Sequence, residues 1–331
     1  MAHAVQASPC LKAEADLAIP TVALDVIVPT FKRARTLGRT LDSLMAARMP
    51  AQSRIHVTVV QNDAELETTK VIRDYVARYP GRISGLSEPR SGKSHALNTG
   101  IGNTSGDLVG FVDDDEEIDP GWYEEVERGC RDPGVDFVGG PCLPLWGSAP
   151  PFWLPPSWRG VIGFADHGNE QMVFGQGPGM LMGGNAVIRR SVLAGVGRYS
   201  GALGPRATRR LFSSEDEDLY QRLLAAGAHG LYLPAMRVYH WVPTNRLTKA
   251  YHRNWSFWNG VSKSVLDSAR PSPVARIGRV PRYLFGTALR GTVAAAVALR
   301  RDPARVFEGQ LALLHLLGFL YGSYLYREER R

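Results

Sequence analysis

Between residues 24 and 118, short β-branched segments alternate with amphipathic segments along this chain of 331 residues. The segments LDVIVPTF, IHVTVVQNDA and LVGFVDDDEEI are typical of strands, whereas RTLDSLMAARM and LETTKVIRDYVARY have the apolar spacing of helices. A Gly-rich connection precedes the third strand. A helix between two strands returns the chain in parallel, so this order predicts an α/β fold with a mostly parallel central sheet flanked by helices.

Polar residues follow each of the three predicted strands. In an open parallel sheet, the ligand binds in the crevice outside the carboxyl ends of the strands. The residues expected there are Pro29, Thr30 and Phe31, then Asn62 and Asp63, and then Asp113, Asp114 and Asp115. Residues 134–185 are rich in Gly, Pro and Trp, which predicts long loops and short strands around this crevice.

Three consecutive carboxylates, Asp113, Asp114 and Asp115, directly follow the third predicted strand. Their mutual repulsion raises their proton affinity unless a cation compensates it. Side-chain alternation puts Asp113 and Asp115 on one side, and such hard oxygen ligands suit Mg²⁺ or Mn²⁺. The alternative is a solvated acidic turn that caps the helix predicted to begin near Pro120.

A second acidic cluster, Glu215 to Asp218, lies at the start of the predicted helix SEDEDLYQRLLAAG. Either Ser213 or Ser214 is placed to cap this helix. The positive end of the helix dipole favours ionised carboxylates, and an ionised carboxylate that faces a site can act as a general base. The alternative is ordinary first-turn helix chemistry, which the presence of the earlier aspartates makes less attractive.

Two basic residues and one histidine complete the set of candidate site residues. The sequence SGKS ends like a phosphate-binding P-loop, but the pattern requires glycine at position 87, which is Ser87. Arg90 and Lys93 then remain as residues of a flexible loop that either meet an anion or are solvated surface charges. His240 ends a strand-like segment, LYLPAMRVYHWV, where a metal or phosphate contact competes with a core histidine.

The positive charge of the chain is concentrated at its C-terminal end. Residues 245–331 hold 15 Lys and Arg against five acidic residues, whereas residues 1–244 hold 24 against 27. Such a basic segment suggests an anionic surface as partner, either nucleic acid or the inner leaflet of a membrane. Two apolar stretches, Tyr283–Leu299 and Leu311–Tyr326, lie within it and are unsuited to a solvated nucleic-acid surface, so we expect no nucleic-acid partner.

The two apolar stretches favour a helical region that lies in the membrane interface over one that spans the bilayer. The second stretch would be about 24 Å long as a helix, shorter than the hydrocarbon core of about 30 Å. The first carries Arg290 near its middle, which disfavours crossing. The alternative is that both helices simply pack on the rest of the protein.

The N-terminal residues and the cysteines predict a cytoplasmic protein. Residues 1–22 are small, polar and Ala-rich, without the basic start and apolar run of a secretory signal, and are expected to be a flexible tail. The three cysteines, Cys10, Cys130 and Cys142, are odd in number and lack CxxC spacing, which fits a reducing compartment. Together with the basic C-terminal region, this predicts the cytoplasmic face of the cell membrane, with peripheral or monotopic attachment.

An ordered series of segments resembles a known family. VIVPTFKR, VVQNDA, SEPRSGKSHALNTGI, GDLVGFVDDDEEIDPGW, GGNAVIRRSVL and SEDEDLYQRLLAAG follow one another between residues 23 and 245. In this order and spacing they resemble the inverting family 2 glycosyltransferases with the GT-A fold, in the branch of bacterial exopolysaccharide and cell-surface glycan assembly. The resemblance implies a Rossmann-like catalytic domain over residues 23–245, followed by the basic, apolar helical region at 246–331.

The resemblance also implies metal-dependent, inverting transfer of a sugar from a nucleotide-sugar donor, with a UDP-sugar favoured. Asp216 matches the catalytic base, and Asp113 and Asp115 match the metal-binding DxD motif, with Mn²⁺ or Mg²⁺ as cofactor and His240 as a further metal ligand. The residues implied for the donor nucleotide are Pro29, Thr30, Phe31, Arg33, Asp63, Arg90, Lys93, Asp113 and Asp114. The residues implied for the sugar and acceptor pocket are Gly183, Gly184, Asn185 and Glu215.

Two departures from the family pattern refine the expected reaction. The second strand ends in Gln61-Asn62-Asp63-Ala64, which differs from the more usual Asp-Asn or Asp-Asp ending at the base contact. Residues 251–255 read YHRNW where processive members carry QxxRW, which favours addition of a single sugar. The basic apolar region fits a membrane-linked acceptor such as a polyprenyl-diphosphate oligosaccharide.

Two alternative functions are weighed against this one. A sugar-nucleotide nucleotidyltransferase usually has a Gly-rich loop after the first strand, but PTFKRART has no glycine there. A non-catalytic carbohydrate-binding module would explain the aromatic loops, but not two acidic clusters at the ends of a strand and a helix.

Overall fold

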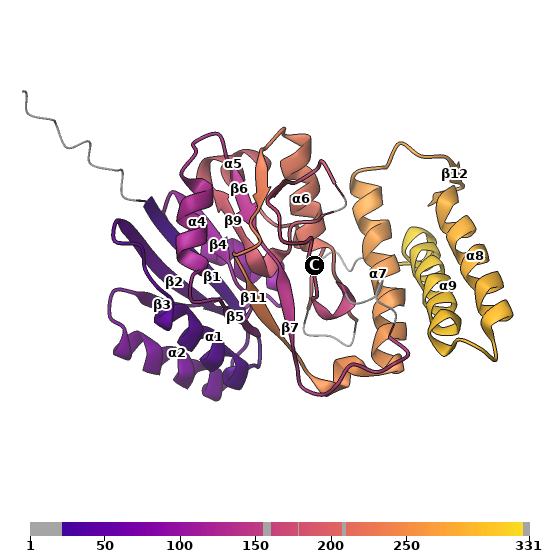
Figure 1. The fold of residues 1–331 in the computed structure, drawn as a ribbon, viewed down its shortest axis with the longest axis horizontal. Helices are drawn as coiled ribbons and strands as arrows, with labels where there is room; N and C mark the ends of the chain where they lie inside the picture. The colour runs from indigo at the N-terminus through magenta and orange to yellow at the C-terminus, as the bar shows by residue number, and fades with distance from the viewer. Residues whose placement is uncertain (1–21, 155–159, 178, 207–209, 327–331) are drawn as a thin grey trace, which may run out of the picture.

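The computed structural model describes residues 22–154, 160–177, 179–206 and 210–326 (Figure 1). Cys10 and nearly all of the expected N-terminal tail, residues 1–21, lie outside this range. The strands of the large sheet are β1 (Val22–Thr30), β2 (Ser53–Gln61), β3 (Ile83–Ser87), β4 (Leu108–Phe111), β6 (Phe137–Gly139), β8 (Met172–Val173), β9 (Ala186–Arg189) and β10 (Gly230–Tyr232). The helices around it are α1 (Ala34–Ala46), α2 (Leu66–Arg78), α3 (Lys93–Gly102), α4 (Trp122–Cys130), α5 (Arg190–Val196) and α6 (Glu215–Ala225).

The order of strands across the large sheet is β3-β2-β1-β4-β9-β6-β10-β8. β3, β2, β1 and β4 run parallel to one another, as do β6 and β10, whereas β9 and β8 pair with their neighbours in the antiparallel direction. The predicted α/β fold with a mostly parallel central sheet flanked by helices is therefore confirmed. The ends of β1 and β4 lie side by side, which brings the residues after Thr30 close to those after Phe111.

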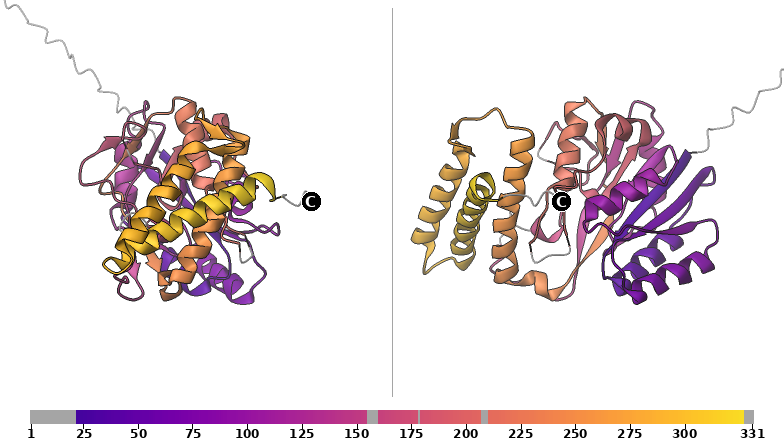
Figure 2. Two further views of the ribbon diagram at one scale, coloured as in Figure 1. Left: turned by 90° about the vertical axis from the view of Figure 1, so that its right-hand side faces the viewer. Right: turned by 180° about the vertical axis from the view of Figure 1, so that it is seen from behind.

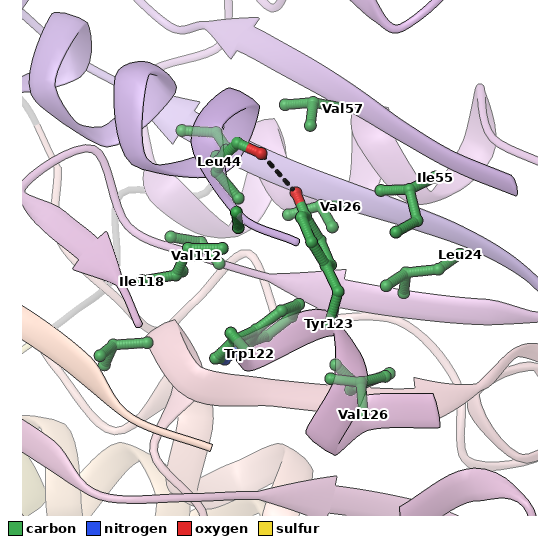
Figure 3. Packing of buried hydrophobic residues seen from close by; sticks show 14 of the residues in the cluster. Leu24, Val26, Leu44, Ile55, Val57, Val112, Ile118, Trp122, Tyr123 and Val126 are labelled. Carbon is green, nitrogen blue, oxygen red and sulfur yellow. Dashed lines mark hydrogen bonds between the residues drawn. The ribbon is translucent and has the colours of Figure 1, made fainter. Parts of the chain in front are cut away.

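Two hydrophobic clusters cover the two faces of this sheet. Helices α1, α2 and α4 bury their apolar residues against one face, and α3, α5 and α6 against the other. On the first face, Trp122 and Tyr123 are almost fully buried beside Val26 and Leu24 (Figure 3). The Tyr123 hydroxyl donates a hydrogen bond to the Leu44 carbonyl of α1, 3.2 Å away, so the polar tip of this core residue is satisfied.

A second sheet of β5 (Glu116–Ile118), β11 (Val238–Val242) and β7 (Cys142–Trp146) lies at the edge of the crevice. The segment LYLPAMRVYHWV, which was predicted as one strand, is divided between β10 of the large sheet and β11 of this sheet. A turn in which Met236 N–H donates to the Leu233 carbonyl separates them. The register pairs His240 with Glu116, so the histidine lies beside the acidic segment that follows β4.

The Gly-rich connection at residues 80–107 contains more regular structure than the sequence indicated. It forms the edge strand β3 and helix α3, which begins at Lys93. Weak helix propensity hid α3, because glycines occupy two of its ten positions. Gly100 instead allows close packing: a Cβ at this position would lie 2.5 Å from Cγ2 of Ile27.

The C-terminal region forms a block of helices at the end of the molecule away from α2 (Figures 1 and 2). η3 (Thr244–Leu247) leads into α7 (Lys249–Ala269), and the short pair β12 (Arg276–Ile277) and β13 (Val280–Pro281) leads into α8 (Arg282–Ala298) and α9 (Pro303–Tyr324). Helix α9 packs against both α7 and α8. Over the described residues, none of the helices combines the length and apolar character needed to cross a bilayer.

Glycines allow α7 and α9 to approach at backbone distance. A Cβ on Gly318 would lie 1.9 Å from the carbonyl oxygen of Phe257, and a Cβ on Gly260 would lie 2.2 Å from the carbonyl oxygen of His315. Because these neighbours are backbone atoms, no side-chain rotation can relieve such contacts. The helices must separate if either glycine gains a side chain.

Gly318→Ala is expected to lower the free energy of unfolding by about 1–3 kcal/mol, since the added methyl group overpacks the α7–α9 contact. Gly38→Ala is the matched control. Gly38 lies within α1, and a Cβ there would have no neighbour within 4 Å. This control is expected to stabilise by about 0.5–1 kcal/mol because alanine loses less backbone entropy in a helix. Denaturant unfolding of both variants measures the two effects, and equal effects would contradict this account of the contact.

Candidate active site

A cavity of about 980 Å³ opens where the carboxyl ends of β1 and β4 meet the second sheet, α6 and α7. Ligand cavities commonly have volumes of about 300–1,000 Å³. The predicted site residues that line it are Pro29, Thr30, Phe31, Arg33, Lys93, Asp113, Asp114, Asp115, Gly183, Gly184, Glu215, Asp216 and His240. Residues from the two acidic clusters, about 100 positions apart in the sequence, therefore share one cavity.

Asp114 joins the end of β4 to the end of β1. One carboxylate oxygen accepts hydrogen bonds from the Thr30 hydroxyl at 2.8 Å and the Phe31 N–H at 3.3 Å, and the other accepts from Arg33 at 2.8 Å. Burial raises the pKa of Asp114 to about 6 against the opposing effect of the Arg33 guanidinium. With its oxygens directed at these partners, Asp114 positions the β1 turn.

Asp115 is surrounded by cationic and imidazole nitrogens. Its Oδ2 accepts from Arg33 at 2.7 Å and from Arg246 at 3.3 Å, and it lies 3.4 Å from Nε2 of His240. Burial alone would raise the pKa of Asp115, but the positive charge around it, which includes Arg33 and Arg246, holds it well below its usual value. Asp115 is therefore a buried, ionised carboxylate.

Lys93, the first residue of α3, bridges the two acidic clusters. Its Nζ lies 2.8 Å from Oδ1 of Asp113, 3.6 Å from Oε1 of Glu215 and 3.9 Å from Oδ2 of Asp216. Burial alone would lower the pKa of Lys93, but these three carboxylates raise it well above its usual value. The side chain is therefore a fixed positive charge between the end of β4 and the start of α6.

Asp216 lies in the first turn of α6 and lines the cavity. Its Oδ2 faces Lys93, whereas its buried Oδ1 has no hydrogen-bond partner among the described residues. Burial raises the pKa of Asp216, and Lys93 opposes that shift. A carboxylate oxygen without a donor, held beside a cation in a cavity, has the chemistry of a general base.

Gly183 makes room for this carboxylate. A Cβ on Gly183 would lie 2.0 Å from Cγ of Asp216, and a Cβ on Gly184 would lie 2.3 Å from Oε2 of Glu116. No larger residue fits at either position without moving an acidic side chain. The GGN segment therefore sets the places of two carboxylates in the cavity.

The predicted serine cap of α6 is wrong in detail. The helix begins at Glu215 as expected, but the N-terminal flanking residue, Ser214, has a left-handed φ of 73° and makes no side-chain cap. Ser213 instead accepts a hydrogen bond from Asn259 of α7 at 3.0 Å. The backbone bends sharply at this point because it must deliver Glu215 and Asp216 into the cavity while meeting α7.

Three predicted site residues do not line the cavity. The Asp63 carboxylate accepts from Lys32 N–H at 2.5 Å and Glu65 N–H at 2.8 Å, and Arg90 pairs with Glu88 at 2.7 Å. Asn185 is fully buried, accepts from the Trp122 indole and donates to two backbone carbonyls, so its amide is used in the core. These side chains are directed to protein partners.

Glu116 and Arg246 line the cavity but were not anticipated from the sequence. Burial, with Asp113 and Asp115 nearby, raises the pKa of Glu116 well above its usual value. Glu116 directly follows Asp113, Asp114 and Asp115 in the sequence, and this position could have indicated that it belongs to the site. Arg246 carried no such signal, because only the fold brings η3 beside Asp115.

The contact with Arg246 assigns His240 a neutral ring with an unprotonated Nε2, the form in which imidazole binds a metal ion. Arginine has only donors, so the 3.0 Å contact from Nη1 of Arg246 makes Nε2 of His240 the acceptor, and the ring proton is assigned to Nδ1. Nδ1 is buried and has no partner in the described parts of the chain, with Gly163 close to it. In this tautomer the Nε2 lone pair of His240 is taken up by Arg246, and Nε2 lies 3.4 Å from Oδ2 of Asp115.

The donor set fits a divalent cation that takes part of its coordination from a ligand. Within the described ranges, no three His, Cys, Asp or Glu side chains group to hold a metal by themselves. Asp115 Oδ2 and His240 Nε2 nevertheless lie 3.4 Å apart and face the cavity side by side. Mg²⁺ commonly takes one or two carboxylates plus substrate phosphates, Mn²⁺ prefers similar oxygen ligands, and imidazole is a common ligand of transition-metal ions.

The sequence matches the family model described as Glycosyl transferase family 2 over residues 25–197, just over half of the chain. It is 28% identical over 244 residues to the succinoglycan biosynthesis protein ExoM of Rhizobium meliloti, covering 72% of this chain and 74% of that protein. It is 24% identical over 252 residues to the glucosyl-dolichyl phosphate glucuronosyltransferase of Haloferax volcanii, covering 75% and 78% respectively.

The fold is similar to those of solved glycosyltransferases. A mannosyltransferase from Pyrobaculum calidifontis, PcManGT, solved in complex with GDP-Man and Mn²⁺, has a TM-score of 0.60 at 17% identity, covering 91% of this chain and 87% of that chain. TarS of S. aureus has a TM-score of 0.53 at 15% identity, covering 86% and 55%. At these identities the likeness concerns the fold alone, and it confirms the predicted GT-A architecture.

The position of Glu215 predicts a pH-dependent stability. Burial and the neighbouring Asp216 raise the pKa of Glu215 to about 8 against the opposing effect of Lys93, from a usual value near 4.5. Between these values the folded protein binds more protons than the unfolded chain, so this contribution to the free energy of unfolding is present below pH 4.5 and is lost as the pH rises through 8.

Glu215→Gln should therefore become progressively more stable relative to the wild type as the pH rises from 5 to 9. Denaturant unfolding in a chelating buffer measures the difference at each pH. Glu67→Gln, which changes an exposed carboxylate on α2, is the control and should show no comparable trend. A stability difference for Glu215→Gln that stays constant with pH would contradict the assignment.

Proposed function

Because this chain belongs to glycosyl transferase family 2, we propose that its cavity adds one sugar from a nucleotide-sugar donor to a lipid-linked glycan, with inversion at the anomeric carbon. As a member of that family it is a glycosyltransferase of glycan biosynthesis. The observation that carries the proposal is Asp216, whose side chain lines the same cavity as Asp115 and His240 and has one carboxylate oxygen without a hydrogen-bond partner among the described residues. Membership of a family of sugar transferases favours this function over a nucleotidyltransferase and over a non-catalytic binding module.

The donor is proposed to lie in the crevice at the ends of β1 and β4. Phe31 and Pro29 offer apolar surface for a nucleotide base, and Arg33 and Lys93 supply positive charge for a diphosphate. PcManGT was solved with GDP-Man and Mn²⁺. A second similar structure, GalNAc-T7, was solved with UDP, GalNAc and Mn²⁺. Its TM-score is 0.52 at 16% identity, covering 76% of this chain and 51% of that chain. We take a UDP-sugar as the first donor to test.

Asp115 and His240, with Asp113 beside them, are the residues proposed to hold Mn²⁺ or Mg²⁺. When bound, the ion would neutralise charge on the diphosphate leaving group. Lys93 adds a second positive charge, fixed by three carboxylates near the place where the bond to the diphosphate breaks.

Asp216 is proposed to take the proton from the acceptor hydroxyl. The acceptor oxygen then forms a bond to the anomeric carbon while the bond from that carbon to the diphosphate oxygen breaks, and the diphosphate leaves with the electron pair. Attack from the face opposite the leaving group inverts the configuration in one step, through an oxocarbenium-like state. Lys93, 3.9 Å from Oδ2 of Asp216, favours the ionised form that this role requires.

The acceptor is proposed to enter beside α7 from a membrane surface. Tyr251, Trp255, Asn259 and Lys263 of α7 line the cavity, so the C-terminal helical block forms one wall of the site. One relative is described as acting on glucosyl-dolichyl phosphate, a lipid-linked sugar. This relative supports an acceptor of the same class for this chain.

The outer side of the helical block has the character of a membrane-binding surface. We define the outer face of α8 by its exposed apolar residues, which are Tyr283, Leu289, Val293 and Val297, and exposed Leu299 follows directly after the helix. Exposed arginines accompany them at positions 282, 290 and 300. Apolar side chains flanked by cations favour the interface of an anionic leaflet, so we propose attachment to the cytoplasmic face of the cell membrane.

Asp216→Asn should lower the transfer rate by at least about 100-fold, since general bases of this kind contribute 10²–10⁴-fold. Donor binding should persist, because the asparagine keeps the shape of the side chain. Thermal shift with UDP, GDP, dTDP and CMP in the presence of Mn²⁺ identifies the bound nucleotide and measures its binding to both proteins. Asp74→Asn, which changes an exposed residue of α2, is the control. Equal loss of binding and transfer would remove Asp216 as the base.

A double variant, Val293→Glu with Val297→Glu, should lose binding to anionic vesicles, because both residues are exposed on the outer face of α8. Cosedimentation with phosphatidylglycerol vesicles measures binding, and circular dichroism checks that the helices persist. Leu66→Glu changes an 84% exposed residue of α2, at the opposite end of the molecule, and should leave binding unchanged. Undiminished cosedimentation of the double variant would refute the membrane surface.

A further inference from the structure

Arg246 spans the two groups proposed to bind the divalent cation. Its Nη2 donates to Oδ2 of Asp115 at 3.3 Å, and its Nη1 donates to Nε2 of His240 at 3.0 Å. Asp115 and His240 are both nearly buried, and the Arg246 side chain is only 19% exposed. A single guanidinium therefore satisfies both a carboxylate oxygen and an imidazole lone pair away from solvent.

A guanidinium and a divalent cation cannot use these two atoms together. A metal ion held by both atoms would use the lone pairs to which Arg246 now donates. Like charges at such short range repel strongly in a buried site. The two cations must therefore exchange with each other.

We propose that Arg246 occupies the cation position while the donor site is empty, and that it is exchanged for a divalent cation that arrives with a nucleoside diphosphate. The inference rests on the proposed function only in taking Asp115 and His240 as the cation ligands. It assigns Arg246 as a positioning residue that keeps the lone pair of His240 directed into the cavity and sets the order in which cation and nucleotide bind.

Arg33 also contacts Asp115, but its environment differs. Its Nη1 lies 2.7 Å from Oδ2 of Asp115 but is also held at 2.8 Å by Oδ1 of Asp114, so Asp114 keeps Arg33 at the β1 turn when a cation takes its place on Asp115. Arg246 alone of the two contacts His240. Arg246 is therefore the residue that must leave before His240 can bind an ion.

The position of Arg246 in the chain suits such a movement. It lies on the short helix η3, between His240 on β11 and the first turn of α7, and it lines the cavity beside Asn245. An arginine released from Asp115 retains a planar pair of donors, which match the oxygens of a diphosphate. Each ligand then increases the affinity for the other. The cation displaces the Arg246 guanidinium from Asp115 and His240, and the guanidinium donates hydrogen bonds to the diphosphate oxygens.

The test is the affinity for Mn²⁺ in the absence of any nucleotide, measured by electron paramagnetic resonance of the free ion. Arg246→Ala should bind Mn²⁺ about tenfold or more tightly than the wild type, the scale of one charge-assisted contact that no longer competes. Arg246→Gln, which removes the charge and retains length, should change in the same direction and serves if the alanine variant does not fold. Arg253→Ala, which removes the next arginine in the sequence, on α7, should bind Mn²⁺ with the same affinity as the wild type.

A second measurement adds UDP, and GDP in parallel, to the same titrations. The wild type should gain Mn²⁺ affinity on adding the nucleotide that binds, whereas Arg246→Ala should gain much less because its cation site is already open. Unchanged or weaker Mn²⁺ binding by the Arg246 variants, while the wild type binds Mn²⁺ with nucleotide, would overturn the exchange and leave the proposed function intact. Absence of Mn²⁺ binding by every variant, with and without nucleotide, would overturn both this inference and the cation assignment.

Discussion

The organisation of the cavity depends on the concentration of negative charge at the end of β4. Six carboxylates gather there in the described structure, and the cationic side chains that contact them are Arg33, Lys93 and Arg246. Burial, together with the neighbouring carboxylates Asp115 and Asp216, raises the pKa of Asp114 to about 6 and that of Glu215 to about 8. A further cation bound here would lower these pKa values, because nearby positive charge favours ionised carboxylates.

The topology delivers the residues of the site from the end of β4, from one face of the large sheet and from the second sheet. Asp113 to Asp115 follow β4, Asp216 comes from α6 on one face, and His240 comes from β11. Gly183 and Gly184 lie between these elements and leave the space that two acidic side chains require. Carboxylates pressed together in this way would drive the elements apart without Lys93, which contacts members of both clusters.

The sequence predicted those parts of the site that local order determines. Strand–helix alternation located the crevice, the acidic runs pointed to Asp113, Asp115 and the cluster Glu215–Asp218, and the family resemblance selected Asp216 within that cluster; Asp113, Asp115 and Asp216 all line the cavity. Features set by tertiary contacts were out of reach: the division between β10 and β11 depends on which sheet accepts each half, and η3 is far from Asp115 in sequence. Asp63, Arg90 and Asn185 differed because nearby backbone or side-chain partners take up their polar groups, and a motif does not show such competition.

Helix α7 connects the base to the region proposed to meet the membrane. On one side it packs against α9 at backbone distance, through Gly260 and Gly318. On the other side it holds the start of α6: Asn259 donates to Ser213, and Lys263 pairs with Glu217, next to Asp216. Because packed helices transmit displacement instead of absorbing it, the position of Asp216 depends on how the helical block is seated. An acceptor that enters along α7 therefore meets a base whose placement is set by the same helix that forms its binding wall.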